Sequence, residues 1–474
     1  MSGPRVPARL LVSVAVLAAL AAGVGAPARA TYGARTTADE PQYLLTAISL
    51  AEDGDLDIAD ELAAERWRAF HEAPLPVQTR PLADGRRVSP HDPLLPLLLA
   101  PGAALGGWVG AKLTLAALAG ALAALLVWTA VARLGVPPRV AWVCVAVFAC
   151  SAPLAVYGTQ IYPELPAALM VTTAVAAVTG RLGGPGLWTL AGAVVALPWL
   201  SVKYVPVAAV LALLALARLA RQHRARVGMA LAVGLVAAGV VFVAVHELVW
   251  TGPTPYASAD HFVGSGELGV VGFSPDYLGR SRRLVGLLVD RRFGIAAWQP
   301  AWLLAVPGLA ALARRRPPGW GALAAPLAAG WLNATFVALT MQGWWFPGRQ
   351  VVVVLPPAVL AVAWWAGRHP PARRAVAVAG TLGVAGYAWL VVDALAGRVT
   401  WVVDFARTGD PLYRLLAPAL PDYLDVTWVT WTLHAAWAVA VGALAVWGWR
   451  SAGGVAAGPP AAQPTSNSVT MPSS

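Results

Sequence analysis

Long apolar runs, most of them about 20 residues in length, alternate along the chain with short breaks that carry Arg, Pro or Gly. A helix needs about 20 apolar residues to cross roughly 30 Å of hydrocarbon. The pattern therefore predicts an all-α, polytopic integral membrane protein with about twelve transmembrane helices. The predicted spans are residues 9–28, 109–132, 140–157, 163–180, 187–200, 203–220, 227–249, 294–313, 320–341, 350–367, 375–392 and 428–449.

The segments between these spans complete the predicted organisation. Three of them are long, at residues 30–92, 251–293 and 393–427. The run PLLPLLLAPGAALGG at 93–107 is too short and too rich in Pro and Gly to cross a membrane, which predicts a re-entrant or interfacial piece. A transmembrane domain is expected over residues 1–450, and the Ala, Gly, Pro and Ser composition of 451–474 predicts a disordered cytoplasmic tail.

Arg residues decide the predicted orientation, because cytoplasmic loops of membrane proteins are enriched in Lys and Arg. A cytoplasmic N-terminus gives every cytoplasmic break at least one Arg and places the three long segments outside. Both termini are then cytoplasmic, and the acidic residues fall in outer loops or near outer helix ends. The first apolar run, followed by APARA at 26–30, also fits a cleavable secretory signal, and charge alone does not separate these alternatives.

Composition supports the membrane assignment. The chain is 58% hydrophobic and 12% charged, which leaves too little polar surface to cover a soluble globule of this length. The net charge of +11 is spread through loops rather than gathered on one polar domain, which favours contact with anionic membrane lipids over nucleic acid. Cys144 and Cys150 fall in one apolar run and are expected in the core rather than in a disulfide framework or metal site.

The segment TADEPQYLLTAISL at 37–50 places two adjacent carboxylates, Asp39 and Glu40, directly beyond the first apolar run. From Tyr43 onward apolar residues recur at helical spacing, which predicts an amphipathic helix along the membrane surface. The carboxylates lie at its N-terminal end, where backbone N–H groups and the helix dipole favour anions. A helix cap requires only one of them, so both are also candidates for chemistry.

Six segments of the chain, in order, resemble bacterial membrane glycosyltransferases of the C class (GT-C), the superfamily of protein mannosyltransferases and the lipid A aminoarabinose transferase. The segments are ADEPQYLLTAISLAEDGDLDI, SPHDPLLPLLLAPGAALGG, YGTQIYPELPAAL, ALPWLSVKY, LLVDRRFGIAAWQPAWLLAVPGL and GWWFPGRQVVVVLPP. The resemblance spans about residues 9–367, and its most specific element is the acidic pair in the first outer loop. The first helix of that family is retained, which favours a signal anchor here.

The resemblance implies transfer of a sugar, with inversion, from a polyprenyl-phosphate donor to a cell-envelope acceptor at the outer face of a bacterial plasma membrane. Asp39 would be the general base that deprotonates or orients the acceptor hydroxyl, and Glu40 would assist it. Such a base is typically worth about 10²- to 10⁴-fold in rate. The leaving group is a phosphate, so the site also requires fixed positive charge.

Basic residues near outer helix ends are the candidates for that charge. The donor-phosphate candidates are Arg349, Lys203, Arg291 and Arg292. The guanidinium of Arg349 could bind the phosphate, and the two tryptophans shortly before it would anchor at the membrane interface or contact a prenyl chain. In the alternative role, the Arg349 side chain only extends to the membrane surface, among interfacial aromatic residues. Lys203, one of only two lysines, lies at an outer helix end and should face a partner or water.

Further outer residues are candidates for binding the substrates or a metal. The substrate-binding candidates are Tyr43, His91, Asp92, Glu164, Trp344 and Trp345. His91 and Asp92, with Asp39 or Glu164, could hold a divalent cation such as Mg²⁺ or Mn²⁺, but their spacing fits no defined metal motif. The alternating acids of 53–61 suggest a Ca²⁺ loop, yet the rest of an EF-hand is missing, which favours a solvated acidic face.

Two other classes of protein share the predicted architecture. A transporter or lipid flippase would also have about twelve crossings, but coupled transport usually needs ionisable groups near mid-membrane and often repeated halves, and the sequence shows neither. A catalytically inactive scaffold of cell-wall assembly stays open as an alternative. The intact acidic pair favours the enzyme.

Overall fold

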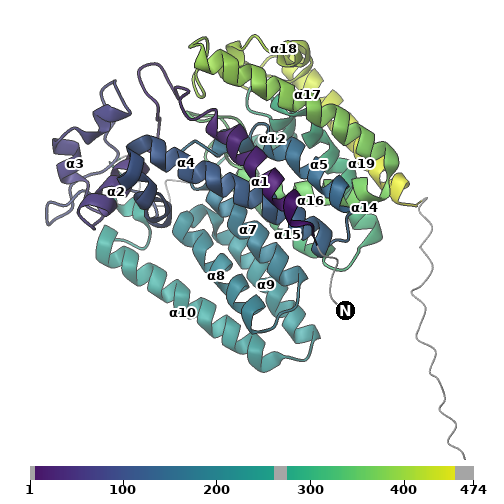
Figure 1. The fold of residues 1–474 in the computed structure, drawn as a ribbon, viewed down its shortest axis with the longest axis horizontal. Helices are drawn as coiled ribbons and strands as arrows, with labels where there is room; N and C mark the ends of the chain where they lie inside the picture. Colours follow the sequence, from purple (N-terminus) through teal and green to yellow (C-terminus); the bar gives the residue numbers. More distant parts are fainter. Residues whose placement is uncertain (1–5, 261–274, 454–474) are drawn as a thin grey trace, which may run out of the picture.

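The computed structural model describes residues 6–260 and 275–453, and its regular elements over these ranges are helices (Figure 1). The longer helices are α1 (Ala8–Gly23), α2 (Glu40–Glu52), α4 (Leu94–Ala132), α5 (Pro138–Ala149), α7 (Glu164–Thr179), α8 (Gly184–Leu200), α9 (Val205–Arg221), α10 (Ala225–Trp250), α14 (Ala305–Arg315), α15 (Trp320–Leu332), α16 (Leu355–Arg368), α17 (Pro370–Leu395) and α19 (Trp428–Gly453). Shorter helices are α3 (Ala59–Ala63), α6 (Leu154–Tyr157), α11 (Tyr277–Arg280), α12 (Arg283–Val289), α13 (Ile295–Trp298) and α18 (Pro411–Leu416).

The predicted all-α, polytopic fold class is confirmed. Each predicted span coincides with one helix or with consecutive helices. Within the described residues, five helical segments are both long and apolar enough to cross a membrane: Leu94–Ala132, Val202–Arg221, Ala225–Ser258, Pro370–Leu395 and Trp428–Gly453. Further apolar helices are 10–17 residues long, so the count of about twelve crossings stays a prediction.

Burial separates the helices into a core and a lipid-facing set. In the most apolar window of α4, 61% of the residues are buried inside the protein, and this helix packs against α1, α2, α5 and α7. In α10 and α19 only 6% are buried, although these helices are also strongly apolar. An apolar surface of that extent is unfavourable in water, so these faces meet lipid. α10 lies at an edge of the molecule, against α8 and α9 (Figure 1).

The piece predicted at 93–107 is the first part of α4, which is not one straight helix. Gly106 and Gly107 have non-helical backbone angles, and Gly107 has a φ of 56° that favours glycine. A Cβ built on Gly110 would lie 1.9 Å from the carbonyl oxygen of Gly102. Residues eight apart are separated by about 12 Å along a straight helix. The chain therefore folds back at 106–107 into a helical arm that precedes the crossing.

The remaining expectations for the fold have mixed outcomes. Cys144 is buried and Cys150 is half-buried, and both are free thiols. Residues 451–453 of the predicted tail are the last turn of α19, and 454–474 lie outside the described residues. The part of the long segment 251–293 at 261–274 lies outside them as well.

The backbone contact at the fold-back leads to a stability prediction. Gly110→Ala should lower the melting temperature in detergent, because its methyl group has no room beside Gly102 and overpacking typically costs about 1–3 kcal/mol. Gly192→Ala in α8 is the matched control, since its Cβ would meet nothing within 4 Å. Thermal unfolding followed by tryptophan fluorescence measures both. Equal melting temperatures for Gly110→Ala and the native protein would contradict the fold-back.

Candidate active site

The acidic pair lies at the start of α2, at the predicted place, but the two side chains have different surroundings. Asp39 is the residue before the helix and Glu40 is its first residue. Packing against α4 buries residues 40–49, so α2 is enclosed by protein rather than exposed along the membrane surface. The Glu40 side chain is fully buried, whereas that of Asp39 is 25% exposed.

Four of the predicted site residues form one chain of ion pairs. Arg349 Nη2 donates to Asp39 Oδ2 at 2.6 Å, and Arg349 Nε donates to Glu164 Oε1 at 3.0 Å. Lys203 Nζ donates to the same Glu164 oxygen at 2.6 Å. The two inner members, Arg349 and Glu164, are buried, while the outer members, Asp39 and Lys203, are about a quarter exposed. We call this set the Asp39–Lys203 network.

The network sets the charge of Asp39. Burial alone would raise the pKa of this carboxyl, but the Arg349 guanidinium, with smaller contributions from His91 and Lys203, holds it well below its usual range. In contrast, burial raises the pKa of Glu40 above its usual value, despite the Lys112 ammonium and the Ile161 N–H. Two neighbouring carboxyls with pKa values pushed apart can serve different roles. At neutral pH Asp39 is ionised, whereas Glu40, with a pKa of about 7, is only partly so.

Aromatic rings hold the Arg349 guanidinium in place. Its central carbon lies 3.9 Å from the ring centre of Tyr162 and 4.9 Å from that of Trp345, which are cation–π distances. The Tyr162 hydroxyl donates to the Thr37 carbonyl at 3.2 Å, beside the acidic pair. Sequence reasoning missed Tyr162. The available signal was its position two residues before Glu164 in IYPELP.

His91 and Tyr43, two of the predicted substrate-binding residues, border the network. Their rings stack with centres 4.5 Å apart and an interplanar angle of 20°. His91 Nε2 lies 3.2 Å from the Gln78 side-chain oxygen, and the Gln78 amide donates to the Ala38 carbonyl at 3.1 Å. His91 is thereby held beside Asp39, whose pKa it helps to lower.

Asp92 is not available to substrate. Its side chain is buried, Oδ2 accepts the Val202 N–H at 3.0 Å, and Oδ1 lies 3.2 Å from His246 Nε2. Asp92 therefore fixes the backbone directly before Lys203. The structure does not gather His91, Asp92 and Asp39 or Glu164 around one point that could hold a cation. In the described parts of the chain such a group occurs elsewhere, between the end of α2 and α3.

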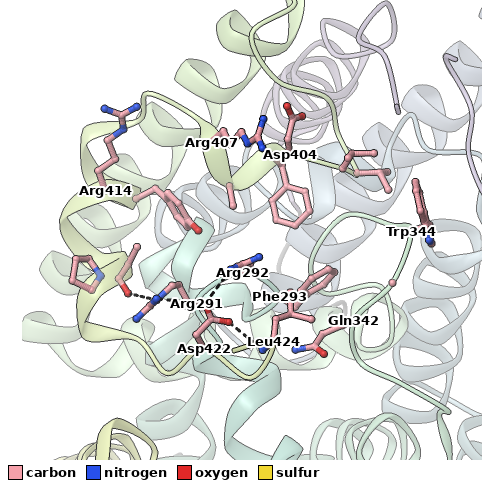
Figure 2. Close-up of a pocket in the computed structure, with 18 of the residues that line it drawn as sticks. Arg291, Arg292, Phe293, Gln342, Trp344, Asp404, Arg407, Arg414, Asp422 and Leu424 are labelled. Atoms are coloured by element: carbon pink, nitrogen blue, oxygen red, sulfur yellow. Dashed lines mark hydrogen bonds and ion pairs between the residues drawn. The ribbon is translucent and has the colours of Figure 1, made fainter. Parts of the chain in front are cut away.

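Arg291 and Arg292 are not members of the network and instead line a neighbouring cavity of about 840 Å³ (Figure 2). Both guanidinium groups lie near Asp422 Oδ2, at 3.4 and 3.2 Å. The cavity is also lined by Tyr32, Gln342, Trp344, Asp404, Phe405, Arg407, Tyr413 and Arg414. Trp344 is 61% exposed, and its carbonyl accepts the Tyr162 hydroxyl at 3.4 Å. The 342–349 segment thus connects the cavity with the network.

These features define a polytopic, all-helical membrane protein with a charged site at one end of its helices, and comparison with solved structures identifies the fold. The chain is similar to ArnT from Cupriavidus metallidurans, whose crystal structure is bound to undecaprenyl phosphate. The TM-score is 0.54 at 15% sequence identity, over 94% of this chain and 75% of ArnT. No family model and no curated protein matches the sequence. The chain therefore shares the polytopic, all-helical fold of ArnT, and at this identity the likeness concerns the fold alone.

The shared carboxylate of the network leads to a second stability prediction. Glu164→Gln should destabilise the protein by about 3–5 kcal/mol, because it leaves the Arg349 and Lys203 cations side by side in a buried site. Glu72→Gln, which breaks the exposed pair with Arg29, is the control and should have no measurable effect. Thermal unfolding at pH 7 tests both variants. A native-like Glu164→Gln would show that the four residues are not coupled.

Proposed function

We propose that this protein is an inverting glycosyltransferase that moves a sugar from a polyprenyl-phosphate donor to a cell-envelope acceptor at the extracytoplasmic face of a bacterial plasma membrane. The observation that supports it most is the Asp39–Lys203 network, which presents a carboxylate at one end and an ammonium at the other. Inverting transfer requires these two groups: a base at the acceptor hydroxyl and positive charge at the departing phosphate.

Asp39 is the proposed base. The acceptor oxygen attacks the anomeric carbon, the bond from that carbon to the phosphate oxygen breaks, and the acceptor proton passes to the Asp39 carboxylate. In the absence of substrate Arg349 makes this carboxylate a weak base. A donor phosphate that draws the guanidinium to itself would weaken the pair and raise the pKa of Asp39. Donor binding would then strengthen the base when it is needed.

Glu40 has a supporting role in this proposal. Its carboxylate is buried and accepts the Ile161 N–H at 2.8 Å, so it cannot touch the acceptor and instead fixes the turn that carries Tyr162. Tyr162 in turn lies under Arg349. Glu40 is therefore a positioning residue rather than a second base.

The positive charge is divided between two places. Lys203 and Arg349 are linked to Asp39 through the network, so we assign the leaving phosphate to them. Arg291, Arg292 and Trp344 line the adjoining cavity, where they supply a second wall for the donor headgroup. A requirement for Mg²⁺ or Mn²⁺, the alternative that the sequence leaves open, can be read by adding EDTA to the assay below.

The decisive experiment is a transfer assay on the purified full chain in lipid nanodiscs, with a panel of polyprenyl-phosphate sugars as donors. Asp39→Asn should reduce transfer about 10²- to 10⁴-fold, because it removes the base and keeps the shape of the side chain. Binding of the lipid-linked donor should persist. Asp84→Asn, an exposed acid of the same outer loop paired with Arg86, is the control and should keep full activity.

Equal turnover of Asp39→Asn and the native protein would contradict the assignment of the base. Solute or lipid flux in proteoliposomes, without transfer, would identify a carrier or flippase. Absence of both transfer and donor binding would identify a scaffold.

The low pKa of Asp39 also predicts a pH dependence. A base acts when deprotonated, so activity falls only as the pH drops through its pKa, and for Asp39 that point lies below the range in which the protein can be assayed. Arg349→Met removes the main cause of the low pKa and leaves burial, which raises it. The fall of kcat/KM at low pH, the acid limb of the profile, should therefore occur at a higher pH, within the measurable range.

Two comparisons make the pH test specific. Arg292→Met removes a cation from the cavity and should leave the acid limb unchanged. Glu40→Gln removes the other carboxyl of the pair. If kcat/KM still falls at acid pH in the Arg349→Met, Glu40→Gln double variant, the group that titrates is Asp39. An Arg349→Met profile with the native shape would refute the electrostatic role of Arg349.

A further inference from the structure

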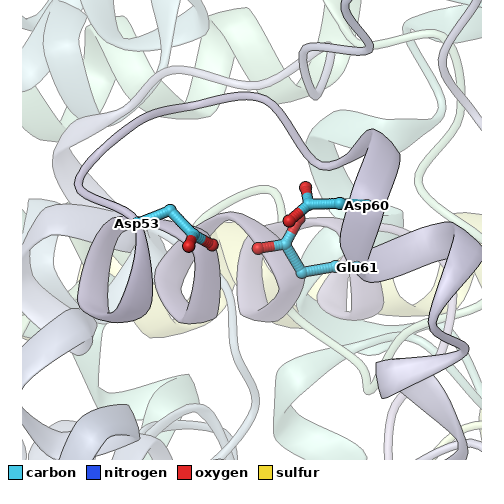
Figure 3. Close-up of side chains that lie close together, drawn as sticks. All are labelled: Asp53, Asp60 and Glu61. Carbon is cyan, nitrogen blue, oxygen red and sulfur yellow. The ribbon is translucent and has the colours of Figure 1, made fainter.

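Three carboxylates of the first outer loop converge away from the Asp39–Lys203 network (Figure 3). Asp53 directly follows the last residue of α2, and Asp60 and Glu61 lie in the first turn of α3. One ligand atom from each lies within 4.8 Å of the other two. The predicted solvated acidic face therefore holds for the exposed Asp53 and Asp60 but fails for Glu61, which is buried.

Glu61 is the unusual member of this group. Its residue is only 3% exposed, and both carboxylate oxygens are buried without a hydrogen-bond partner. The side chain points towards the carboxylates of Asp53 and Asp60 (Figure 3). The nearby Arg66 is bound to Glu52 at 2.5 Å. Burial and the neighbouring Asp60 carboxyl both make the ionised form of Glu61 unfavourable in the absence of a cation. In native proteins a buried polar group without a hydrogen-bond partner usually has a ligand.

We propose that Asp53, Asp60 and Glu61 bind a calcium ion. Calcium takes six to eight oxygen ligands at about 2.3–2.6 Å, so two of its ligand oxygens are at most about 4.6–5.2 Å apart, and three oxygens within 4.8 Å of one another are close enough to share one ion. The group has only carboxylate oxygens, which suits a hard cation rather than zinc or copper. The exposed sides of Asp53 and Asp60 leave room for water to complete the coordination.

The loop between these residues is already folded in a way that suits the ion. The Ser49 hydroxyl lies 2.8 Å from the Asp57 carbonyl and 3.0 Å from Asp55 Oδ1, and the Asp57 N–H donates to that same oxygen at 2.9 Å. Asp57 Oδ1 accepts the Ala59 and Arg87 N–H groups at 3.1 and 2.8 Å, so the carboxylates of both Asp55 and Asp57 have partners in the loop, whereas Asp53 faces α3. A cation here would join the end of α2 to α3 and hold in place the helix whose other end carries Asp39.

The test is direct binding of ⁴⁵Ca²⁺ to the EGTA-treated full chain in nanodiscs. One calcium ion per chain is expected, with a dissociation constant on the order of 10⁻⁴ to 10⁻³ M, the range of extracellular calcium modules. Calcium should also raise the melting temperature in a concentration-dependent way. Asp53→Asn, Asp60→Asn and Glu61→Gln should each weaken binding at least tenfold, and Asp84→Asn should leave it unchanged.

The outcomes separate the alternatives. No binding by the native protein, or equal binding by all the variants, would overturn the site. Loss of binding in Glu61→Gln alone would also overturn it, since that variant alters a buried side chain, whereas Asp53 and Asp60 are exposed and can be changed without disturbing packing. Magnesium that binds as tightly as calcium would overturn the assignment of the ion as calcium, which rests on the ligand distances of that ion. The measurement needs no sugar transfer, so its result is independent of the proposed enzymatic function.

Discussion

The buried guanidinium of Arg349 is the interaction on which the rest of the site depends. It lies between Asp39 and Glu164, and either carboxylate alone would be costly to enclose in protein. Its partners come from the residue before α2 and from the start of α7, and Lys203 joins from the segment before α9. The charged site can form only after these distant segments have packed, so the fold and the ionised state of Asp39 are established together.

Much of the fold could be predicted from the sequence, because the length and placement of apolar runs follow directly from the thickness of a membrane. The same reasoning found Asp39, Glu164, Lys203 and Arg349 one at a time, as charges near outer helix ends. It could not pair them, since Asp39 and Arg349 are 310 positions apart and no local pattern reports that contact. The Pro and Gly content of 93–107 predicted a re-entrant or interfacial piece there, but it could not give the close backbone contact between Gly102 and Gly110 that follows from the fold-back.

The acidic pair shows why adjacent residues need not share a role. Successive side chains on a helix point about 100° apart, so at the start of α2 one carboxylate can face the open site while its neighbour enters the core. Asp39 is the exposed member and Glu40 the buried one. Asp92 differs in the same way from its neighbour His91, since it turns inward to hold the Val202 backbone. Sequence alone gives the pair but not the direction of each side chain.

Rigid and variable parts of the site lie on different kinds of structure. The network residues Glu164 and Arg349 are buried, and the Tyr162 and Trp345 rings lie against the Arg349 guanidinium, so packing restricts the positions of both side chains. In contrast, segments between helices, at 402–407 and 342–344, supply much of the cavity wall around Arg291 and Arg292. Such segments can change in length and side chain without disturbing the helices beneath them. Under the proposed function, the choice of sugar and acceptor would therefore reside in the cavity wall, while the buried network keeps the reacting groups in place.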